Sequence, residues 1–202
     1  MPRLFVPICD NSIYAHLILT MKGRNLEIQV YGNPVLQQKT KAVDKITDEI
    51  LQLIADLKVT MREKEGLGLA ANQVGISLAV IAVNPKGAEI DQEPFAVINP
   101  ELVECSGQIE REEGCLSIPG ISEVVARPTK VIVKGINEEG KPVQINAEGL
   151  LARVFMHEID HINGVFFVNH LGKTRLELLQ NQLKEITRNR KNTSTKTKRK
   201  TQ

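Results

Sequence analysis

The sequence of 202 residues has few aromatic side chains, few cysteines and no long apolar run. Aromatic residues make up 3% of it, so a hydrophobic core must be built mainly from Leu, Ile, Val and Ala. No stretch approaches the roughly 18 consecutive apolar residues of a spanning helix, and we expect nothing that crosses a membrane. Cys9, Cys105 and Cys115 are odd in number and form no CxxC pair. This pattern argues against a disulfide scaffold, favours a reducing, cytoplasmic compartment and leaves a thiol available for metal binding or chemistry.

The net charge of +2 is unevenly distributed along the chain. Residues 186–202 contain seven basic residues and no acid, which leaves −5 for the remainder. We predict a basic, disordered tail at residues 190–202, a single folded domain at residues 25–189 and an N-terminal extension of open role at residues 1–24. The apolar patches of the extension are too short for a secretory signal, and translation from Met21 is an alternative.

Hydrophobic periodicity predicts three helices. Residues 44–64 and 174–188 carry apolar side chains at helical spacing, whereas residues 148–162 are apolar on two flanks, as expected of a buried central helix. Apolar or alternating runs between turn signals predict short strands at residues 26–30, 78–83, 95–98, 122–125, 130–136, 141–145 and 165–168. The expected fold is therefore α+β, with mostly antiparallel strands around the buried central helix and a further helix at the C-terminal end.

The predicted central helix contains the run His157-Glu158-Ile159-Asp160-His161, an HExxH pattern. On a helix its two imidazoles lie at i and i+4 on one face, where two neutral ring nitrogens can reach one metal ion. Glu158 then stays free to move protons. A coincidental pair of histidines on a polar helix face is the alternative.

A third ligand has candidates on both sides of this run. Downstream, the metzincin pattern requires a histidine at the position of Phe167. Other zincins use a downstream glutamate as the third ligand, but the candidates Glu177 and Glu185 lie on a helix that is predicted to be exposed. Upstream, Cys115 in the segment EGCLS is a candidate, because a thiolate beside a dication is deprotonated and binds tightly. An ordinary small, buried cysteine in a loop is the alternative.

The segment GLGLAANQVG at residues 66–75 matches the dinucleotide-binding expression G-x-G-x-x-A at Gly66, Gly68 and Ala71. That fingerprint follows a strand and opens a helix. Here a predicted helix precedes the glycines and a strand follows, so we expect no dinucleotide. A loop of small residues suits close approach of the backbone to a ligand, and Gln73 can direct an amide N–H into that space. A tight helix-to-strand turn is the alternative.

Together, three segments resemble the motifs of peptide deformylases. The patterns GxGxAAxQ at residues 66–73, EGCxS at residues 113–117 and HExDH at residues 157–161 are each intact and occur in the order of that family. The resemblance extends from Leu26 to Arg188. It implies a deformylase-like catalytic domain, a hydrolase that removes the N-terminal formyl group from formylmethionine of newly synthesised polypeptides and releases formate.

The resemblance also implies a metal site. Cys115, His157 and His161 would hold one divalent ion, most commonly Fe(II), with Zn, Ni or Co as substitutes, and leave a fourth position to water. By this resemblance the metal would lower the pKa of that water, and the resulting hydroxide would attack the formyl carbon with Glu158 as general acid and base.

Further residues would bind and polarise the substrate. The side-chain amide of Gln73 and the backbone N–H of Leu116 would form the oxyanion hole. The Gly68 backbone would pair with the peptide as an added strand. The apolar pocket for methionine is expected to be lined by Leu67, Leu150 and Val154, with the ring of His157 as part of its wall.

Behind these residues, Glu113 or Asp160 is expected to hold a histidine or Arg127. For Asp160, a plain surface position is an equal alternative.

The C-terminal helix and basic tail suit an enzyme that works at the ribosome, because rRNA attracts Lys and Arg; a merely solvated end is the alternative. Two rival functions are compatible with the sequence. One is a zinc endopeptidase of HExxH type, which needs a third ligand downstream. The other is a catalytically silent ribosome-associated binder, which has no chemical need for Glu158, Gln73 and Cys115 together.

Overall fold

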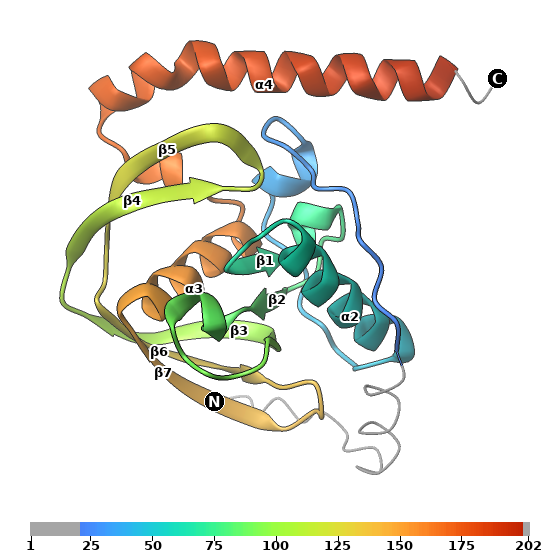
Figure 1. The fold of residues 1–202 in the computed structure, drawn as a ribbon, viewed down its shortest axis with the longest axis vertical. Helices are drawn as coiled ribbons and strands as arrows, with labels where there is room; N and C mark the ends of the chain where they lie inside the picture. Colours follow the sequence, from blue (N-terminus) through green and yellow to red (C-terminus); the bar gives the residue numbers. More distant parts are fainter. Residues whose placement is uncertain (1–20, 200–202) are drawn as a thin grey trace.

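The computed structural model describes residues 21–199, with side chains described up to residue 190. Its strands form two antiparallel sheets (Figure 1). The larger sheet has five strands in the order β1-β2-β3-β6-β7. These are β1 (Gly68–Ala70), β2 (Val80–Val83), β3 (Phe95–Ser106), β6 (Lys130–Ile136) and β7 (Pro142–Glu148). The smaller sheet is a hairpin of β4 (Ile109–Cys115) and β5 (Ile118–Arg127).

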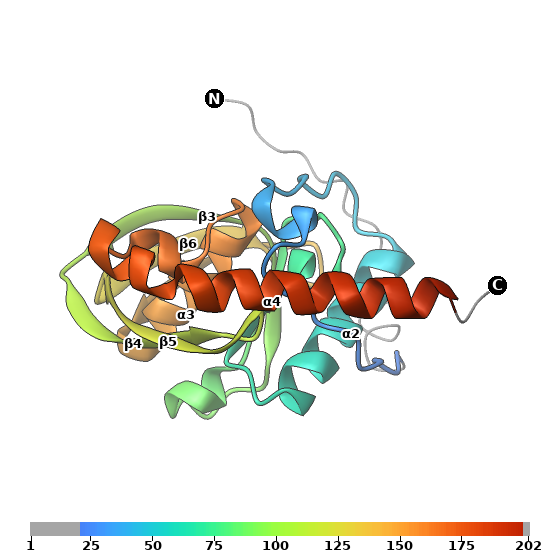
Figure 2. The same ribbon diagram turned by 90° about the horizontal axis from the view of Figure 1, so that it is seen from above.

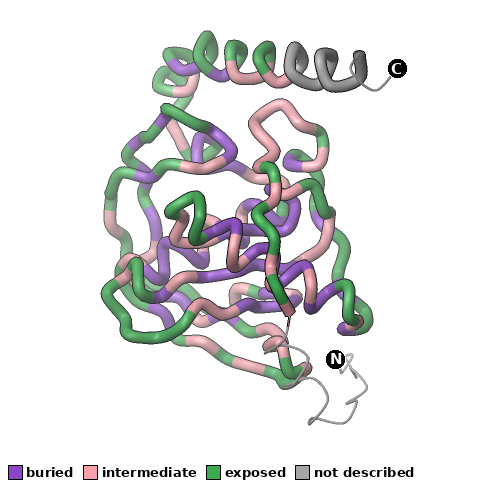
Figure 3. The backbone as a smooth tube through the Cα atoms, turned by 45° about the vertical axis from the view of Figure 1, so that its right-hand side comes forward, coloured by how far each residue is buried: buried purple, intermediate pink, exposed green. Residues whose placement is uncertain are grey.

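Helices α2 (Asp48–Glu63) and α3 (Gly149–Ile162) cover opposite faces of the larger sheet. Strand β2, Val-Ile-Ala-Val, is buried along its whole length, and alternate residues join the apolar cluster of α2 and the cluster of α3. Since successive side chains of a strand point to opposite faces, an uninterrupted apolar run needs cover on both. Nine residues of α3 are buried, and Figure 3 shows buried backbone concentrated in the middle of the molecule.

Helix α4 (Lys173–Arg199) runs along the outer side of the β4–β5 hairpin (Figures 1 and 2). A third apolar cluster joins the hairpin to the 3-10 turn η4 (Phe167–His170) and to Leu179 and Leu183 of α4. Arg175 adds an ion pair with Glu123 of β5, at 2.7 Å from Nε to Oε2. The hairpin therefore lies between α4 outside and α3 inside.

The predicted α+β class, with mostly antiparallel strands and a C-terminal helix, is confirmed. The hairpin of β6 and β7 and the helix with the histidines lie within a few residues of their predicted bounds. Strand β4 was not predicted, because Glu110, Arg111 and Glu112 give no apolar run, although the segment pairs with β5 along its length.

Two predicted strands are wrong. Residues 26–30 form no strand, because their backbone makes isolated hydrogen bonds to different segments and no ladder with one partner. The N–H of Gln29, for example, donates to the carbonyl of Gln73 at 2.7 Å. Residues 165–168 run into η4 instead. There the side chain of Asn169 accepts the N–H of Phe166 at 2.8 Å and closes a turn.

The C-terminal helix is longer than predicted. The sequence predicted a helix end near residue 188, whereas α4 continues to Arg199. No Gly or Pro occurs after Gly172, so no residue in that stretch breaks a helix.

At the other end, residues 1–20 of the expected extension lie outside the described residues. From Met21 onward the chain packs on α2: Met21 joins the apolar cluster of that helix, and Arg24 binds Asp56 through its backbone N–H and its guanidinium.

Candidate metal centre and active site

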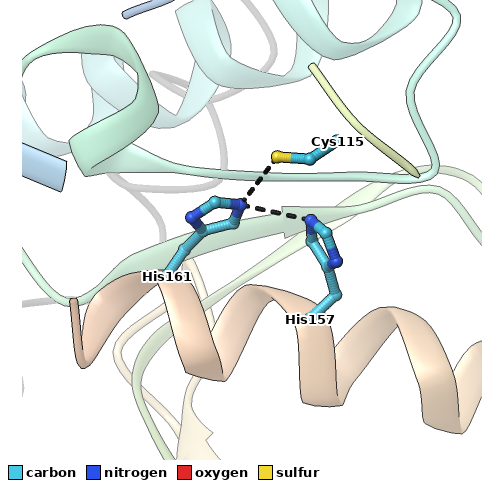
Figure 4. A group of neighbouring side chains, drawn as sticks. All are labelled: Cys115, His157 and His161. Atoms are coloured by element: carbon cyan, nitrogen blue, oxygen red, sulfur yellow. Dashed lines mark hydrogen bonds between the residues drawn. The ribbon is translucent and has the colours of Figure 1, made fainter. Parts of the chain in front are cut away.

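Helix α3 presents the two histidines of the HExxH run on one face. Their Nε2 atoms lie 3.1 Å apart. Figure 4 shows both rings projecting from the same side of the helix toward Cys115. The ring of Phe167, the residue that stands where metzincins have a histidine, stacks beside His157 with ring centroids 6.4 Å apart. The two exposed glutamates on α4 that were downstream candidates, Glu177 and Glu185, are not part of this cluster.

Cys115 approaches from the last position of β4. Its Sγ lies 3.1 Å from Nε2 of His161. A register shift between Gly114 and Cys115 turns the chain there, and the backbone N–H of Ser117 donates to Sγ at 3.3 Å. Burial alone would raise the pKa of the thiol, but the neighbouring charges of His161 and His157 lower it well below its usual value. The thiolate is the form that binds a metal.

These three side chains fit a divalent metal ion. Their candidate ligand atoms all lie within 4.8 Å of one another. In a tetrahedral site with metal–nitrogen bonds of about 2.0–2.1 Å and a metal–sulfur bond of about 2.3 Å, ligand atoms are roughly 3.3 to 3.6 Å apart. Two of the separations, from Nε2 of His161 to Nε2 of His157 and to Sγ of Cys115, are 3.1 Å and lie close to that spacing. The donor set of one sulfur and two imidazole nitrogens is one that zinc and iron accept.

Glu158 lies beside these side chains without belonging to the cluster. It is 3% exposed, and its Oε2 atom has no hydrogen-bond partner among the described residues. Burial raises the pKa of its carboxyl to about 7, against the opposing charges of His157 and His161. Gly68 of β1 packs directly on it: a Cβ atom added there would meet Cγ of Glu158 at 2.7 Å. Only glycine at position 68 leaves room for this carboxylate.

Gln73 directs its amide toward the same point. It lies in the 3-10 turn η2 (Ala71–Val74), where its Oε1 accepts the N–H of Ala70 at 2.8 Å. That bond turns Nε2 toward Ser117 Oγ at 3.2 Å and Cys115 Sγ at 3.6 Å. The amide donor of Gln73 is therefore fixed beside the candidate metal ligands.

An ionic network supports the histidines from behind. Oε1 of Glu113 lies 2.7 Å from Nδ1 of His157 and accepts Nη2 of Arg127, also at 2.7 Å. Nη1 of Arg127 donates to Asp160 at 2.6 Å, and His170 lies 2.7 Å from the same Asp160 oxygen. Burial would raise the pKa of Glu113, but the hydrogen bonds of His157 and Arg127 hold it far below its usual value. Both expected supporting carboxylates thus make the contacts, and Asp160 is not a plain surface residue.

A cavity of about 710 Å³ opens onto this group. It is lined by residues that were expected to bind or polarise the substrate: Leu67, Gly68, Gln73, Leu116, Leu150, Val154, His157 and Glu158. Cys115 lines it as well, whereas His161 lies behind at 0% exposure. The first residues of β5, Ile118 to Ser122, form a further wall that the sequence did not indicate.

Several polar residues of the site were missed from the sequence, Ser117 and Arg153 among them. Ser117 binds both Cys115 and Gln73; the signal was its place in the EGCLS segment. Arg153 is 5% exposed and pairs with Glu113 at 2.8 Å. Its signal was a charged residue on an otherwise apolar turn of the central helix, four residues before His157.

The fold and this site together define a hydrolase of the HExxH class whose third candidate ligand is a cysteine from a facing hairpin. Comparison with known proteins makes the assignment specific. The family model of polypeptide deformylase matches residues 25–177. The chain therefore belongs to the polypeptide deformylase family, whose members are metal-dependent, and is a hydrolase that acts on N-formyl peptides.

Individual relatives agree. The chain is 46% identical over 154 residues to a peptide deformylase of Halothermothrix orenii, covering 76% of this chain and 98% of the relative. It is 42% identical over 167 residues to that of Aquifex aeolicus, covering 82% and 98%. The crystal structure of a peptide deformylase from Legionella pneumophila superposes with a TM-score of 0.76 at 36% identity, covering 83% of this chain and 98% of that one.

Proposed function

We propose that this enzyme removes the formyl group from N-formylmethionyl peptides by the attack of a metal-activated water, with Glu158 as general acid and base. The observation that carries the proposal is the meeting of three candidate ligand atoms within 4.8 Å at the wall of a cavity that also holds Glu158 and Gln73. The proposed catalytic domain spans residues 25–189.

Cys115, His157 and His161 would hold one divalent ion, which we propose to be Fe(II), with Zn, Ni or Co as substitutes. When bound, the ion supplies a Lewis acid that lowers the pKa of water toward neutrality. The thiolate contributes negative charge, and Glu113 fixes the orientation of the His157 ring.

Glu158 moves the protons. Its carboxylate takes a proton from the attacking water and later delivers one to the leaving amine. The role is supported by a buried Oε2 atom that has no hydrogen-bond partner among the described residues and by the tight packing of Gly68 against the side chain.

Gln73 and Leu116 stabilise the charge that develops on the formyl oxygen. The amide of Gln73 is already oriented by Ala70, so it needs no rearrangement when the charge appears. The backbone N–H of Leu116 directly follows Cys115 and is the second donor. Loss of one such donor typically costs on the order of 100- to 1,000-fold in kcat.

The substrate peptide binds along β1. This strand is the edge of the larger sheet and pairs only with β2 within it, so its other edge is available to an extended peptide. Gly68 supplies backbone hydrogen bonds there. The methionine side chain enters the apolar part of the cavity between Leu67, Leu150 and Val154.

The decisive experiment is anaerobic turnover of a formyl-Met peptide by the Fe(II)-loaded protein. We expect stoichiometric release of formate and a free amino terminus, and a loss of about 100- to 10,000-fold in Glu158→Ala with metal content retained. Absence of formate from the wild type defeats the proposal. Full metal content in Cys115→Ala would instead favour an endopeptidase-type site with another third ligand.

The natural substrates are proposed to be nascent chains in the cytoplasm, reached through a ribosome contact of α4 and the residues after it. Residues 186–202 carry seven basic side chains, which suit rRNA. A chain ending at Arg188 should sediment less with ribosomes than the full chain, and the difference should shrink as salt rises. Equal sedimentation of the two chains contradicts the contact. Among residues 21–199, no helix has the length and apolar character to span a membrane.

A further inference from the structure

A buried arginine one helical turn before His157 takes no part in the chemistry above. Arg153 and His157 are four residues apart on α3 and therefore share one face of it. Nη1 of Arg153 donates to Oε2 of Glu113 at 2.8 Å. The other oxygen of the same carboxylate lies 2.7 Å from Nδ1 of His157. Glu113 thus bridges two successive turns of the helix that carries the histidines.

The rest of the Arg153 guanidinium binds the backbone of the β4–β5 hairpin. Nη2 donates to the carbonyl of Ile109 and Nη1 to that of Val125, each at 3.0 Å. Strand β4 runs from Ile109 to Cys115. Arg153 therefore ties the helix with two of the candidate ligands to the strand with the third.

Glu113 has donors on both of its oxygens, and Arg153 is the one that shares its helix with His157. Arg127 reaches the carboxylate from β5, with Nη2 at 2.7 Å from Oε1 and Nε at 3.1 Å from Oε2. Without Arg153, Oε2 would keep only the longer of its two contacts. The carboxylate could then turn about its last bond, and the angle at which Oε1 meets His157 would vary.

We propose that Arg153 is a positioning residue of the metal site: it fixes the Glu113 carboxylate so that the His157 ring keeps its Nε2 atom turned toward Cys115 and His161. The inference rests on the metal site proposed above. It concerns ligand geometry, so metal affinity is its direct measure, independent of turnover.

The molecule offers a matched control for the test. Arg175 on α4 pairs with Glu123 of the same hairpin at 2.7 Å, and Glu123 is likewise buried. This pair holds the hairpin from the outside, away from the histidines. Arg153→Met and Arg175→Met each remove an arginine–carboxylate tie of the hairpin, but only the first affects the carboxylate that contacts His157.

The experiment is titration of the apo proteins with Co(II), followed by absorption, with the unfolding midpoint in urea measured alongside. We expect Arg153→Met to raise the Co(II) Kd about 10- to 100-fold and to alter the ligand-field bands. Arg175→Met should change the Kd less than about threefold, while lowering the unfolding midpoint. Equal effects of the two substitutions on Kd, or none from Arg153→Met, overturn the inference.

A lysine variant covers the case in which Arg153→Met does not fold. Arg153→Lys keeps the charge but replaces the planar guanidinium, which donates from two nitrogens, by a compact ammonium group. Its Co(II) Kd should therefore still rise about three- to tenfold, whereas that of Arg175→Lys should not rise. Equal Kd values for the two lysine variants count against the inference. Failure of the wild type to bind Co(II) would instead remove the proposed metal site itself, so the two failures are distinguishable.

Discussion

Nδ1 of His157 and Oε1 of Glu113 lie 2.7 Å apart, with Glu113 also paired to Arg127. A histidine that binds a metal through Nε2 carries its proton on Nδ1, and a carboxylate there fixes the tautomer and the ring angle. The contact joins two segments 44 residues apart in the chain. It gives the HExxH helix a fixed partner on the hairpin.

The first prediction concerns this contact. Glu113→Gln should weaken metal binding about 10- to 100-fold, because a neutral amide holds the imidazole less firmly. It also leaves the buried arginines without their carboxylate, which should lower the free energy of unfolding by about 3–5 kcal/mol. Metal Kd and urea unfolding measure the two effects. Glu110→Gln, at an exposed position of the same strand, is the control, and a wild-type metal Kd in Glu113→Gln would refute the role.

The second prediction concerns the packing of Gly68 on Glu158. A methyl group at position 68 would meet Cγ of Glu158 at 2.7 Å and displace the carboxylate. Since a misplacement of about 1 Å can cost 100-fold in rate, Gly68→Ala should lower kcat/KM by about that factor while the metal content stays unchanged. Gly172→Ala is the control, because an added Cβ there has no atom within 4 Å. Near-wild-type turnover by Gly68→Ala would show that Glu158 has freedom to move.

The parts of this site that the sequence predicted are those set by local geometry. The spacing of His157 and His161 on a helix determines that their rings meet, whatever surrounds them. Gln73 follows the same logic, because its orientation depends on Ala70, three residues away. Strand β2 was found for a similar reason, since its apolar run is continuous.

The contacts that the sequence did not reveal depend on distant segments. Arg153 binds Glu113 across 40 residues and Val125 across 28 residues, and no local pattern indicates which carboxylate a buried arginine will meet. Strand β4 was likewise missed, because its residues are mostly charged. Its pairing with β5 brings Cys115 to the histidines. The prediction ended α4 where the apolar side chains at helical spacing end, near residue 188, but the helix continues beyond that point.

The third prediction concerns the metal. A thiolate–Fe(II) site that opens onto a solvent-accessible cavity should react with oxygen, so the Fe(II)-loaded enzyme should lose activity in air. Enzyme reloaded with Ni or Zn should keep its activity over the same period, because these ions do not undergo that oxidation. The measurement is formate release against time of exposure. Lasting activity of Fe(II)-loaded protein in air would mean that the metal or the open site is wrongly assigned.

The fourth prediction concerns stability and pH at a site remote from the metal. Asp56 of α2 is 2% exposed and accepts the backbone N–H and the guanidinium of Arg24 at 2.8 and 2.7 Å. Burial would raise the pKa of Asp56, but the hydrogen bonds from Arg24 and Gln52 hold it below its usual value. The stabilisation is therefore present above the unfolded-state pKa of about 3.9 and is lost as the pH falls through the lower folded-state pKa.

Asp56→Asn should accordingly lower the free energy of unfolding by roughly 1–3 kcal/mol at pH 7, the range for a hydrogen bond to a charged group, with the ion-pair part reduced because Arg24 is largely exposed. Below about pH 4 the difference from the wild type should shrink, because the carboxyl of the unfolded wild type then takes up a proton, and the charge contribution should be gone once the pH is below the lowered folded-state pKa. Urea unfolding of the apo proteins between pH 3 and pH 7 measures this. Glu63→Gln, on the exposed side of the same helix, is the control and should show no such pH-dependent difference. If the difference in free energy of unfolding between Asp56→Asn and the wild type is constant at all pH values, the charge of Asp56 does not stabilise the fold.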